Sequence, residues 1–365
     1  MSRRALAKRK PINLALQGGG AHGAFTWGAL DCLLEDDRVE IEAISGTSAG
    51  AMNAVVVADG LMQAGSEGAR EALEKFWRAV SDSAMNSPLR RTPIDVLLGN
   101  WSLDHSPAFV LFDLVSRVSS PYELNPLNIN PLRDLLAEQV DFDRVRECDK
   151  LRLFISATNV ETGRVKVFRR DELTADAVMA SACLPFIFQS VIIDGVPYWD
   201  GGYMGNPVLF PFFHHCRSSD IVIVQTSPIV REGTPVTARQ ILNRVNEITF
   251  NSSLLREFRA IDFVSRLLED GHLDEKTYKH VLVHRISADE ALKGLGASSK
   301  LNAEWKFLRH LFEIGRQAAA AWLERNYRAI GKRSTLDLRS LFQDGDSTTR
   351  GHDEGGMEDR VSRSI

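Results

Sequence analysis

Two stretches near the start of the chain decide its fold: INLALQGGGAHG at residues 12–23 and IEAISGTSAG at residues 41–50. In each, a short apolar run leads into a glycine-framed turn, and small or apolar residues with helical spacing follow. Similar short apolar runs recur at residues 151–157 and 221–225. This alternation predicts an α/β fold in which helices cover a mainly parallel sheet.

Turn residues predict two hairpins at the edge of that sheet. Gly163 and Gly195 each separate β-rich runs, as glycines do where the chain reverses between antiparallel strands. Apolar residues 281–286 form one further expected strand between two long helical patterns.

Composition narrows the class of protein. The chain has 365 residues, of which 44% are hydrophobic and 25% charged, as in ordinary globular proteins. Its net charge of −4 argues against nucleic-acid binding, which usually requires a basic face. We find no apolar run of about 18 residues and no secretory leader, so we expect a cytoplasmic protein, with peripheral contact to a membrane surface as an addition. The four cysteines lie far apart and are expected to be free thiols.

The second turn, Gly46-Thr47-Ser48-Ala49-Gly50, is suited to presenting a nucleophile. Its small residues permit a tight strand-to-helix turn that places Ser48 at the N-terminus of the next helix. There the positive end of the helix dipole favours an alkoxide-like serine. The alternative is that Ser48 only caps the helix.

The first turn is suited to binding an anion. The consecutive amides of Gly18, Gly19 and Gly20 are candidate donors to the oxyanion of a tetrahedral intermediate. Glycine patterns of this kind also bind dinucleotides, but they then require an acidic residue at the tip of the second strand. Here that strand ends in Ile44-Ser45, so a nicotinamide or flavin enzyme is the less favoured alternative.

Asp200 is the best candidate for a general base. It closes an apolar run and precedes Gly201 and Gly202, which allow the backbone to approach another element closely. Placed against Ser48, its carboxylate could accept the hydroxyl proton directly. Two alternatives stay open: an Asp-Gly turn without chemistry, or a downstream histidine as base. The histidines at residues 214–215 lie among aromatic residues and favour a structural role.

Taken in order, GGGAHG at residues 18–23, GTSAG at residues 46–50 and DGG at residues 200–202 resemble the motifs of the patatin-like phospholipase family. ASACLP at residues 180–185 is similar to the small-residue block of that family, which ends in proline. The resemblance covers about residues 11–230.

This resemblance implies a three-layer α/β/α fold and the hydrolysis of lipid acyl esters. It makes Ser48 the nucleophile and Asp200 the base of a dyad, with Gly18, Gly19 and Gly20 as the oxyanion hole. It implies no metal, no cofactor and no catalytic histidine. The implied partner is a lipid or phospholipid substrate. A lipid-binding or regulatory protein that keeps the fold without turnover is the alternative.

One residue departs from the family pattern. The family commonly has arginine or lysine where this chain has His22, so a permanent positive charge beside the oxyanion hole is absent or depends on pH. We expect His22 either to shape the loop or to touch a headgroup. The remaining motif residues, Gly23, Gly46 and Gly50, are expected to support the two turns.

The resemblance and the composition together divide the chain. We expect a catalytic domain at residues 11–230 and a helical part at residues 231–330 that packs on it. A basic N-terminus at residues 1–10 and a polar tail at residues 331–365 are expected to be disordered. Residues 81–130 combine prolines with apolar side chains. This insertion is either a cap over the site or a few short helices on the core.

Overall fold

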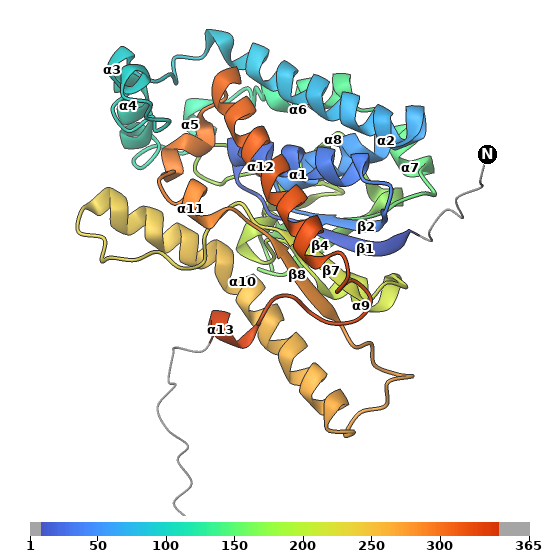
Figure 1. The fold of residues 1–365 in the computed structure, drawn as a ribbon. Helices are drawn as coiled ribbons and strands as arrows, with labels where there is room; N and C mark the ends of the chain where they lie inside the picture. The colour runs from blue at the N-terminus through green and yellow to red at the C-terminus, as the bar shows by residue number, and fades with distance from the viewer. Residues whose placement is uncertain (1–8, 343–365) are drawn as a thin grey trace, which may run out of the picture.

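The computed structural model describes residues 9–342, which fold around one sheet of eight strands (Figure 1). The strands are β1 (Lys10–Leu16), β2 (Val39–Gly46), β3 (Arg152–Asn159), β4 (Val165–Arg169), β5 (Val191–Ile193), β6 (Val196–Asp200), β7 (Asp220–Val224) and β8 (Leu282–Ile286). Their order is β5-β6-β3-β2-β1-β7-β8, and β4 pairs with β3 off this path.

The centre of the sheet is parallel and one side is antiparallel. β1 pairs in parallel with β2 and β7, β2 with β3, and β7 with β8. β3 pairs antiparallel with β4 and β6, and β5 with β6. Gly163 and Gly195 take the positive φ values of 65° and 79° that the hairpin turns need. The mainly parallel sheet and both hairpins are therefore confirmed.

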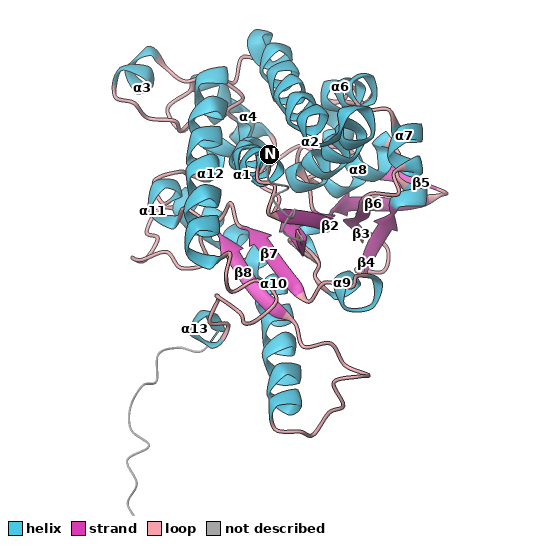
Figure 2. Cartoon of the chain, turned by 45° about the vertical axis from the view of Figure 1, so that its right-hand side comes forward, coloured by secondary structure: helices cyan, strands magenta, loops and turns pink. Residues whose placement is uncertain are grey.

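Helices cover both faces of the sheet (Figure 2). They are α1 (Gly23–Glu35), α2 (Ala49–Ser83), α6 (Pro131–Gln139), α7 (Phe142–Glu147), α8 (Ala175–Ser181), α9 (Phe210–His215), α10 (Ala238–Glu269), α11 (Asp289–Leu292), α12 (Trp305–Asn326) and α13 (Arg339–Phe342). In Figure 1, α1, α2, α8 and α12 lie above the sheet, and α9 and α10 lie below it.

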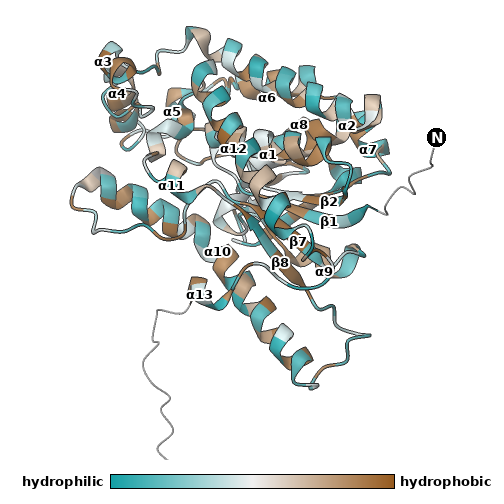
Figure 3. Cartoon of the chain, viewed as in Figure 1, coloured by the Kyte–Doolittle hydropathy of each residue, from teal (hydrophilic) through white to brown (hydrophobic). Residues whose placement is uncertain are grey.

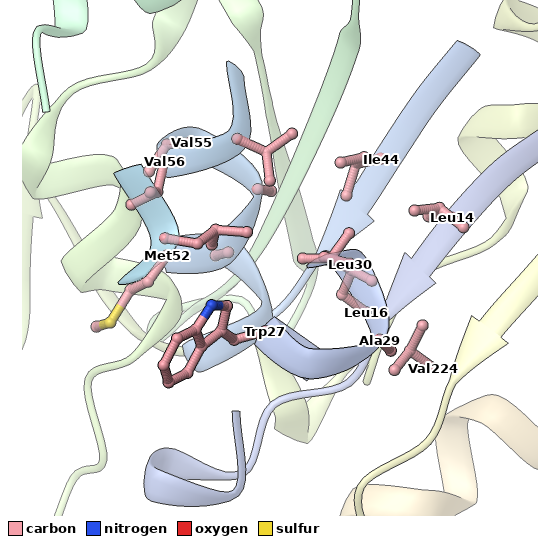
Figure 4. Packing of buried hydrophobic residues seen from close by; sticks show 14 of the residues in the cluster. Leu14, Leu16, Trp27, Ala29, Leu30, Ile44, Met52, Val55, Val56 and Val224 are labelled. Carbon is pink, nitrogen blue, oxygen red and sulfur yellow. The ribbon is translucent and has the colours of Figure 1, made fainter. Parts of the chain in front are cut away.

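Alternating side chains of the strands enter two separate cores. Leu14 and Leu16 of β1 belong to the core under α1, α2 and α12, whereas Ala15 belongs to the core that includes α9 and α10. Figure 4 shows Trp27 and Leu30 from α1 among the side chains of the first core. Two cores on opposite faces of one sheet confirm the three-layer α/β/α architecture.

Helix α12, from the C-terminal part of the chain, lies directly on α1. A Cβ atom on Gly315 would clash with the carbonyl oxygen of Phe25, and one on Gly28 would clash with that of Phe312. The two backbones therefore approach as closely as only glycine permits. This contact ties the C-terminal part to the first β–turn–α unit, which carries the glycine turn.

The insertion at residues 81–130 contains short helices: η2 (Ala84–Asn86), α3 (Pro93–Leu97), α4 (Pro107–Val115) and α5 (Pro121–Leu124). Arg91 joins it to the C-terminal part through a 2.5 Å ion pair with Glu304. Many of its apolar side chains are nevertheless exposed, and Figure 3 shows α4 largely in the hydrophobic colour. They include Met85, Ile94, Val96, Leu97, Leu98, Val110, Leu111, Leu114, Val118, Tyr122, Leu124, Leu127 and Ile129.

The expected disordered ends fall partly on described residues. From residue 331 the chain continues as an ordered segment, because Thr335 and Leu336 both donate backbone hydrogen bonds to Val283 of β8. Leu338 and Phe342 then pack on the second core. Residues 1–8 and 343–365, which include most of the expected disordered ends, lie outside the described residues. Within residues 9–342, no helix is both long enough and apolar enough to cross a bilayer.

Candidate active site

Ser48 lies in the turn between β2 and α2 and has an unusual backbone. Its φ of 55° and ψ of −122° fall where residues with side chains are strained, typically by about 1–3 kcal/mol. Gly46 and Gly50 make this turn possible, since a Cβ on Gly46 would lie 2.6 Å from the Gly50 carbonyl oxygen. The backbone N–H of Ser48 donates to the Ser181 hydroxyl at 2.9 Å. The turn thus fixes the backbone from which the Ser48 side chain projects.

The pairing of β2 and β6 with β3 brings Asp200 close to Ser48. It ends β6 opposite Ala157 of β3, while Gly46 ends β2 opposite Ile155 of the same strand. Both turns therefore leave the sheet at neighbouring positions. The Ser48 side chain lies close enough to the Asp200 carboxylate to lower its pKa.

The Asp200 carboxylate is buried, with 1% of the residue exposed. Its Oδ1 accepts a 2.7 Å hydrogen bond from the N–H of Gly202. Burial raises the pKa of Asp200 to about 7, because the charged form loses its hydration. The hydrogen bond from Gly202, the nearby Ser48 hydroxyl and the charge of Lys300 lower this pKa but do not cancel the effect of burial. A carboxylate with this pKa can take up and release a proton near neutral pH.

Close approach at Gly201 and Gly202 explains why both positions are glycine. A Cβ on Gly201 would clash with the Ser156 carbonyl oxygen, and one on Gly202 would clash with the Phe250 ring. Phe250 belongs to α10 and packs against Tyr203, with ring centroids 5.0 Å apart. Helix α10 therefore reaches over the aspartate turn.

The first glycine turn lies directly against Ser48. A Cβ on Gly18 would stand 2.8 Å from the Ser48 Cβ, and one on Gly23 would stand 2.7 Å from that of Ala49. The N–H of Gly18 already donates to the Asn206 side-chain oxygen at 2.7 Å. For the N–H groups of Gly19 and Gly20 the described residues provide no acceptor. Of the three amides expected as oxyanion donors, only these two are available.

His22 is buried beneath the turn, with 3% of the residue exposed. Its Nε2 lies 2.8 Å from the Ser299 hydroxyl, and its ring meets the Phe307 ring edge-on. Burial, followed by the charges of Lys300 and Arg231, lowers the pKa of His22 to about 3. The imidazole is therefore neutral at physiological pH and carries no conditional charge. Of the two roles expected for it, shaping the loop fits this geometry, whereas contact with a headgroup does not.

Histidines elsewhere in the fold have partners other than Ser48 and Asp200. In α9, His215 stacks on Phe154 and lies 3.0 Å from an Arg169 nitrogen. His284 is buried against Asp220 at 2.9 Å. No histidine within residues 9–342 forms a hydrogen bond with Ser48 or Asp200.

Several residues of the site were not found from the sequence. Ser181 lies in the small-residue block at residues 180–185, so a signal for it was present although no role was assigned. Asn206 and Lys300 belong to no motif. Next to the aspartate, the Cys183 carbonyl accepts the N–H of Asp200 at 2.8 Å. Cys183 also lines a cavity of about 350 Å³ between the insertion, α8 and β5.

The sequence matches a known protein family. The family model described as patatin-like phospholipase matches residues 14–213, which is more than half of the chain. Among curated proteins, no sequence matches this chain.

Two solved structures are similar in part. VipD from Legionella pneumophila is 15% identical, with 84% of this chain and 67% of that chain covered and a TM-score of 0.34. ExoU in its complex with SpcU, from the type III secretion system of Pseudomonas aeruginosa, is 15% identical, with a TM-score of 0.36. The match covers 88% of this chain and 53% of the ExoU chain, so this chain spans about half the length of ExoU. The residues matched by the family model contain both glycine turns, Ser48 and Asp200, and the chain belongs to the patatin-like phospholipase family.

Proposed function

We propose that this chain hydrolyses acyl esters of lipids, with Ser48 as the nucleophile and Asp200 as the base. Membership of the patatin-like phospholipase family supports lipid hydrolysis in general. The observation that carries the finer proposal is that the Ser48 side chain lies close to the buried Asp200 carboxylate, whose pKa burial raises to about 7. This pairing supplies both the nucleophile and the proton acceptor that acyl transfer requires.

The proposed reaction has two stages. Asp200 takes the hydroxyl proton as the Ser48 Oγ attacks the acyl carbon, and it then gives this proton to the departing alcohol. Water next attacks the acyl-enzyme as Asp200 accepts a proton from it. The bond between the acyl carbon and the Ser48 Oγ then breaks, Asp200 returns the proton to Oγ, and the fatty acid leaves. The N–H groups of Gly19 and Gly20 are the proposed donors to the oxyanion of both tetrahedral intermediates, and each such donor is typically worth about 3 kcal/mol.

The lipid is proposed to approach over the insertion. Helices α3 and α4, which carry exposed apolar side chains, lie on the same side of the molecule as the N-terminal half of α10 (Figure 1). Ile241 and Val245 in that half of α10 are also exposed. An apolar face of this kind suits contact with a membrane surface. This face supports peripheral contact with a lipid surface, and the proposed location stays cytoplasmic, as expected from the sequence.

Two substitutions test the dyad. Ser48→Ala and Asp200→Asn should each reduce the release of p-nitrophenol from p-nitrophenyl butyrate by about a thousandfold or more, because each removes a group that reacts. The control is His215→Ala, since His215 lies in α9 outside the site. Activity close to that of the wild type in either dyad variant would exclude the mechanism.

A fluorophosphonate probe separates an enzyme from a lipid-binding protein of the same fold. The probe should label Ser48 in the wild type, as located by peptide mapping, and should fail to label the Ser48→Ala variant. A folded wild-type protein that resists the probe and releases no fatty acid would favour the binding alternative.

A further inference from the structure

Lys300 brings a positive charge to the site from a distant part of the chain. It lies in the 3-10 helix η5 (Ala297–Leu301), which contacts the 3-10 helix η1 (Gly20–His22) of the glycine turn. A Cβ on Gly20 would clash with the Lys300 carbonyl oxygen and would stand 3.4 Å from the Lys300 Cβ. The adjacent Ser299 holds His22 at 2.8 Å. Helix η5 therefore forms one wall of the turn that carries the candidate oxyanion donors.

Several charged groups lie near Lys300, but within residues 9–342 none of them forms a hydrogen bond or ion pair with its ammonium. Asp200 of β6, His22 of η1, Arg231 after β7 and Glu247 of α10 all interact with it electrostatically. Glu247, however, is bonded to Arg231 at 2.8 Å and also accepts from a second arginine. Within residues 9–342 the Lys300 ammonium has no hydrogen bond or ion pair.

No bonded counterion within residues 9–342 offsets the positive charge of the Lys300 ammonium. Burial lowers the pKa of Lys300, because the charged form is poorly hydrated, and the charge of Arg231 acts in the same direction. Glu247 and Asp200 oppose this effect. A partly buried cation without a hydrogen-bonded counterion is costly, and an anionic group of a bound ligand would remove that cost.

We propose that Lys300 binds the phosphate of a phospholipid substrate beside Ser48 and so sets a preference for phospholipids over neutral glycerides. This inference rests on the proposed function. In a glycerophospholipid, the phosphate and the neighbouring acyl ester sit on adjacent glycerol carbons. An ester held at Ser48 by the amides of Gly19 and Gly20 therefore brings its phosphate close to the wall formed by η5. Lys300 acts as the positive charge that is absent at position 22, where His22 is buried and neutral.

The test compares two lipids that differ in the phosphate. Dioleoylphosphatidylglycerol and dioleoylglycerol are presented in the same non-ionic micelles at pH 7.5, and oleate release gives kcat/KM for each. Lys300→Met should lower kcat/KM for phosphatidylglycerol by about tenfold or more, as expected for the loss of a charge-assisted hydrogen bond, and should lower the ratio of the two values by the same factor. Lys300 also lowers the pKa of Asp200, but a change in that pKa affects both substrates and cancels in the ratio.

Three variants complete the design. Lys300→Arg should restore most of the preference, because the charge is kept. Lys300→Gln is a second neutral variant, which serves if Lys300→Met does not fold. The matched control is Lys293→Met, because Lys293 lies in the same C-terminal segment but is partly exposed and 3.5 Å from Glu232.

Each outcome decides the proposal. A selective loss for phosphatidylglycerol in the neutral variants, with recovery in Lys300→Arg, supports it. An equal loss for both lipids would mean that Lys300 acts only through Asp200, and it would overturn the inference while leaving the proposed function intact. A wild type that hydrolyses dioleoylglycerol alone would also overturn it. A wild type that hydrolyses no ester at all would refute the proposed function itself.

Discussion

Replacing Asp200 by asparagine should make the protein more stable at alkaline pH while it removes activity. The side chain is buried, with 1% of the residue exposed, and burial raises its pKa from an ordinary 3.8 to about 7. The folded state therefore binds a proton at Asp200 more tightly than the unfolded state does. Stability must then fall as the pH rises from about 4 to about 7, and the full loss persists above pH 7.

The loss of stability depends on the pH interval over which the folded state keeps the Asp200 proton and the unfolded state does not. At pH 5.5 the unfolded carboxyl is already ionised, whereas the folded one titrates only near 7. From pH 5.5 to the pKa of about 7 there are about 1.5 pH units, and each unit lowers the free energy of unfolding by 1.36 kcal/mol. The wild type therefore loses about 2 kcal/mol of stability between pH 5.5 and pH 8.5. Asparagine does not ionise, so Asp200→Asn avoids this loss. Its amide oxygen can still accept from Gly202, and its NH2 group can donate to the Ser48 hydroxyl.

Urea unfolding at the two pH values measures the prediction. The free energy of unfolding of Asp200→Asn relative to the wild type should rise by about 2 kcal/mol from pH 5.5 to pH 8.5. Glu257 is partly buried and also has a pKa raised to about 7, but it is present in both proteins and cancels in the comparison. Two stability curves that run parallel from pH 5.5 to pH 8.5 would refute the burial of an ionisable Asp200.

Two further predictions concern packing and lipid contact. Gly315→Ala should destabilise the fold by about 2 kcal/mol despite the better helix propensity of alanine, because the new Cβ would clash with the Phe25 carbonyl oxygen. Gly294→Ala, where a Cβ meets no atom within 4 Å, should be nearly neutral in the same urea titration. The double change Leu111→Asp and Leu114→Asp alters side chains of α4 that are 61% and 60% exposed, so it should reduce fatty-acid release from phosphatidylglycerol vesicles severalfold and leave p-nitrophenyl butyrate hydrolysis unchanged. Equal losses on both substrates would argue against α4 as the lipid-contacting surface.

The parts of the fold that the sequence predicts are those set by local backbone geometry. The hairpins at Gly163 and Gly195 were expected because these turn residues separate β-rich runs, and both glycines have positive φ values in the structure. The turn at Ser48 is likewise a local property, because Gly46 and Gly50 leave the space that a tight strand-to-helix turn needs. Apolar runs flanked by such turns located the central strands without any knowledge of their partners.

The tertiary surroundings of the site could not be predicted in this way. The Gly18 amide was expected to face an oxyanion, but the Asn206 side chain takes it, and no spacing in the sequence links the two residues. The expected disorder from residue 331 overlooked a signal that was present. Leu336, Leu338 and Leu341 are apolar residues in a polar segment, and they pack on the second core.

The neutral side chain of His22 is consistent with the positive charge of Lys300 nearby. A permanent cation at position 22 would occupy the buried space between Ser299 and Phe307, where the Lys300 charge already lowers the pKa of the histidine. Two cations there would repel each other with little water to screen them. A neutral histidine in the turn is therefore compatible with a lysine on η5, and a basic residue in the turn would not be. The departure from the family pattern at position 22 thus corresponds to a positive charge supplied from another part of the fold, by a residue that no motif identifies.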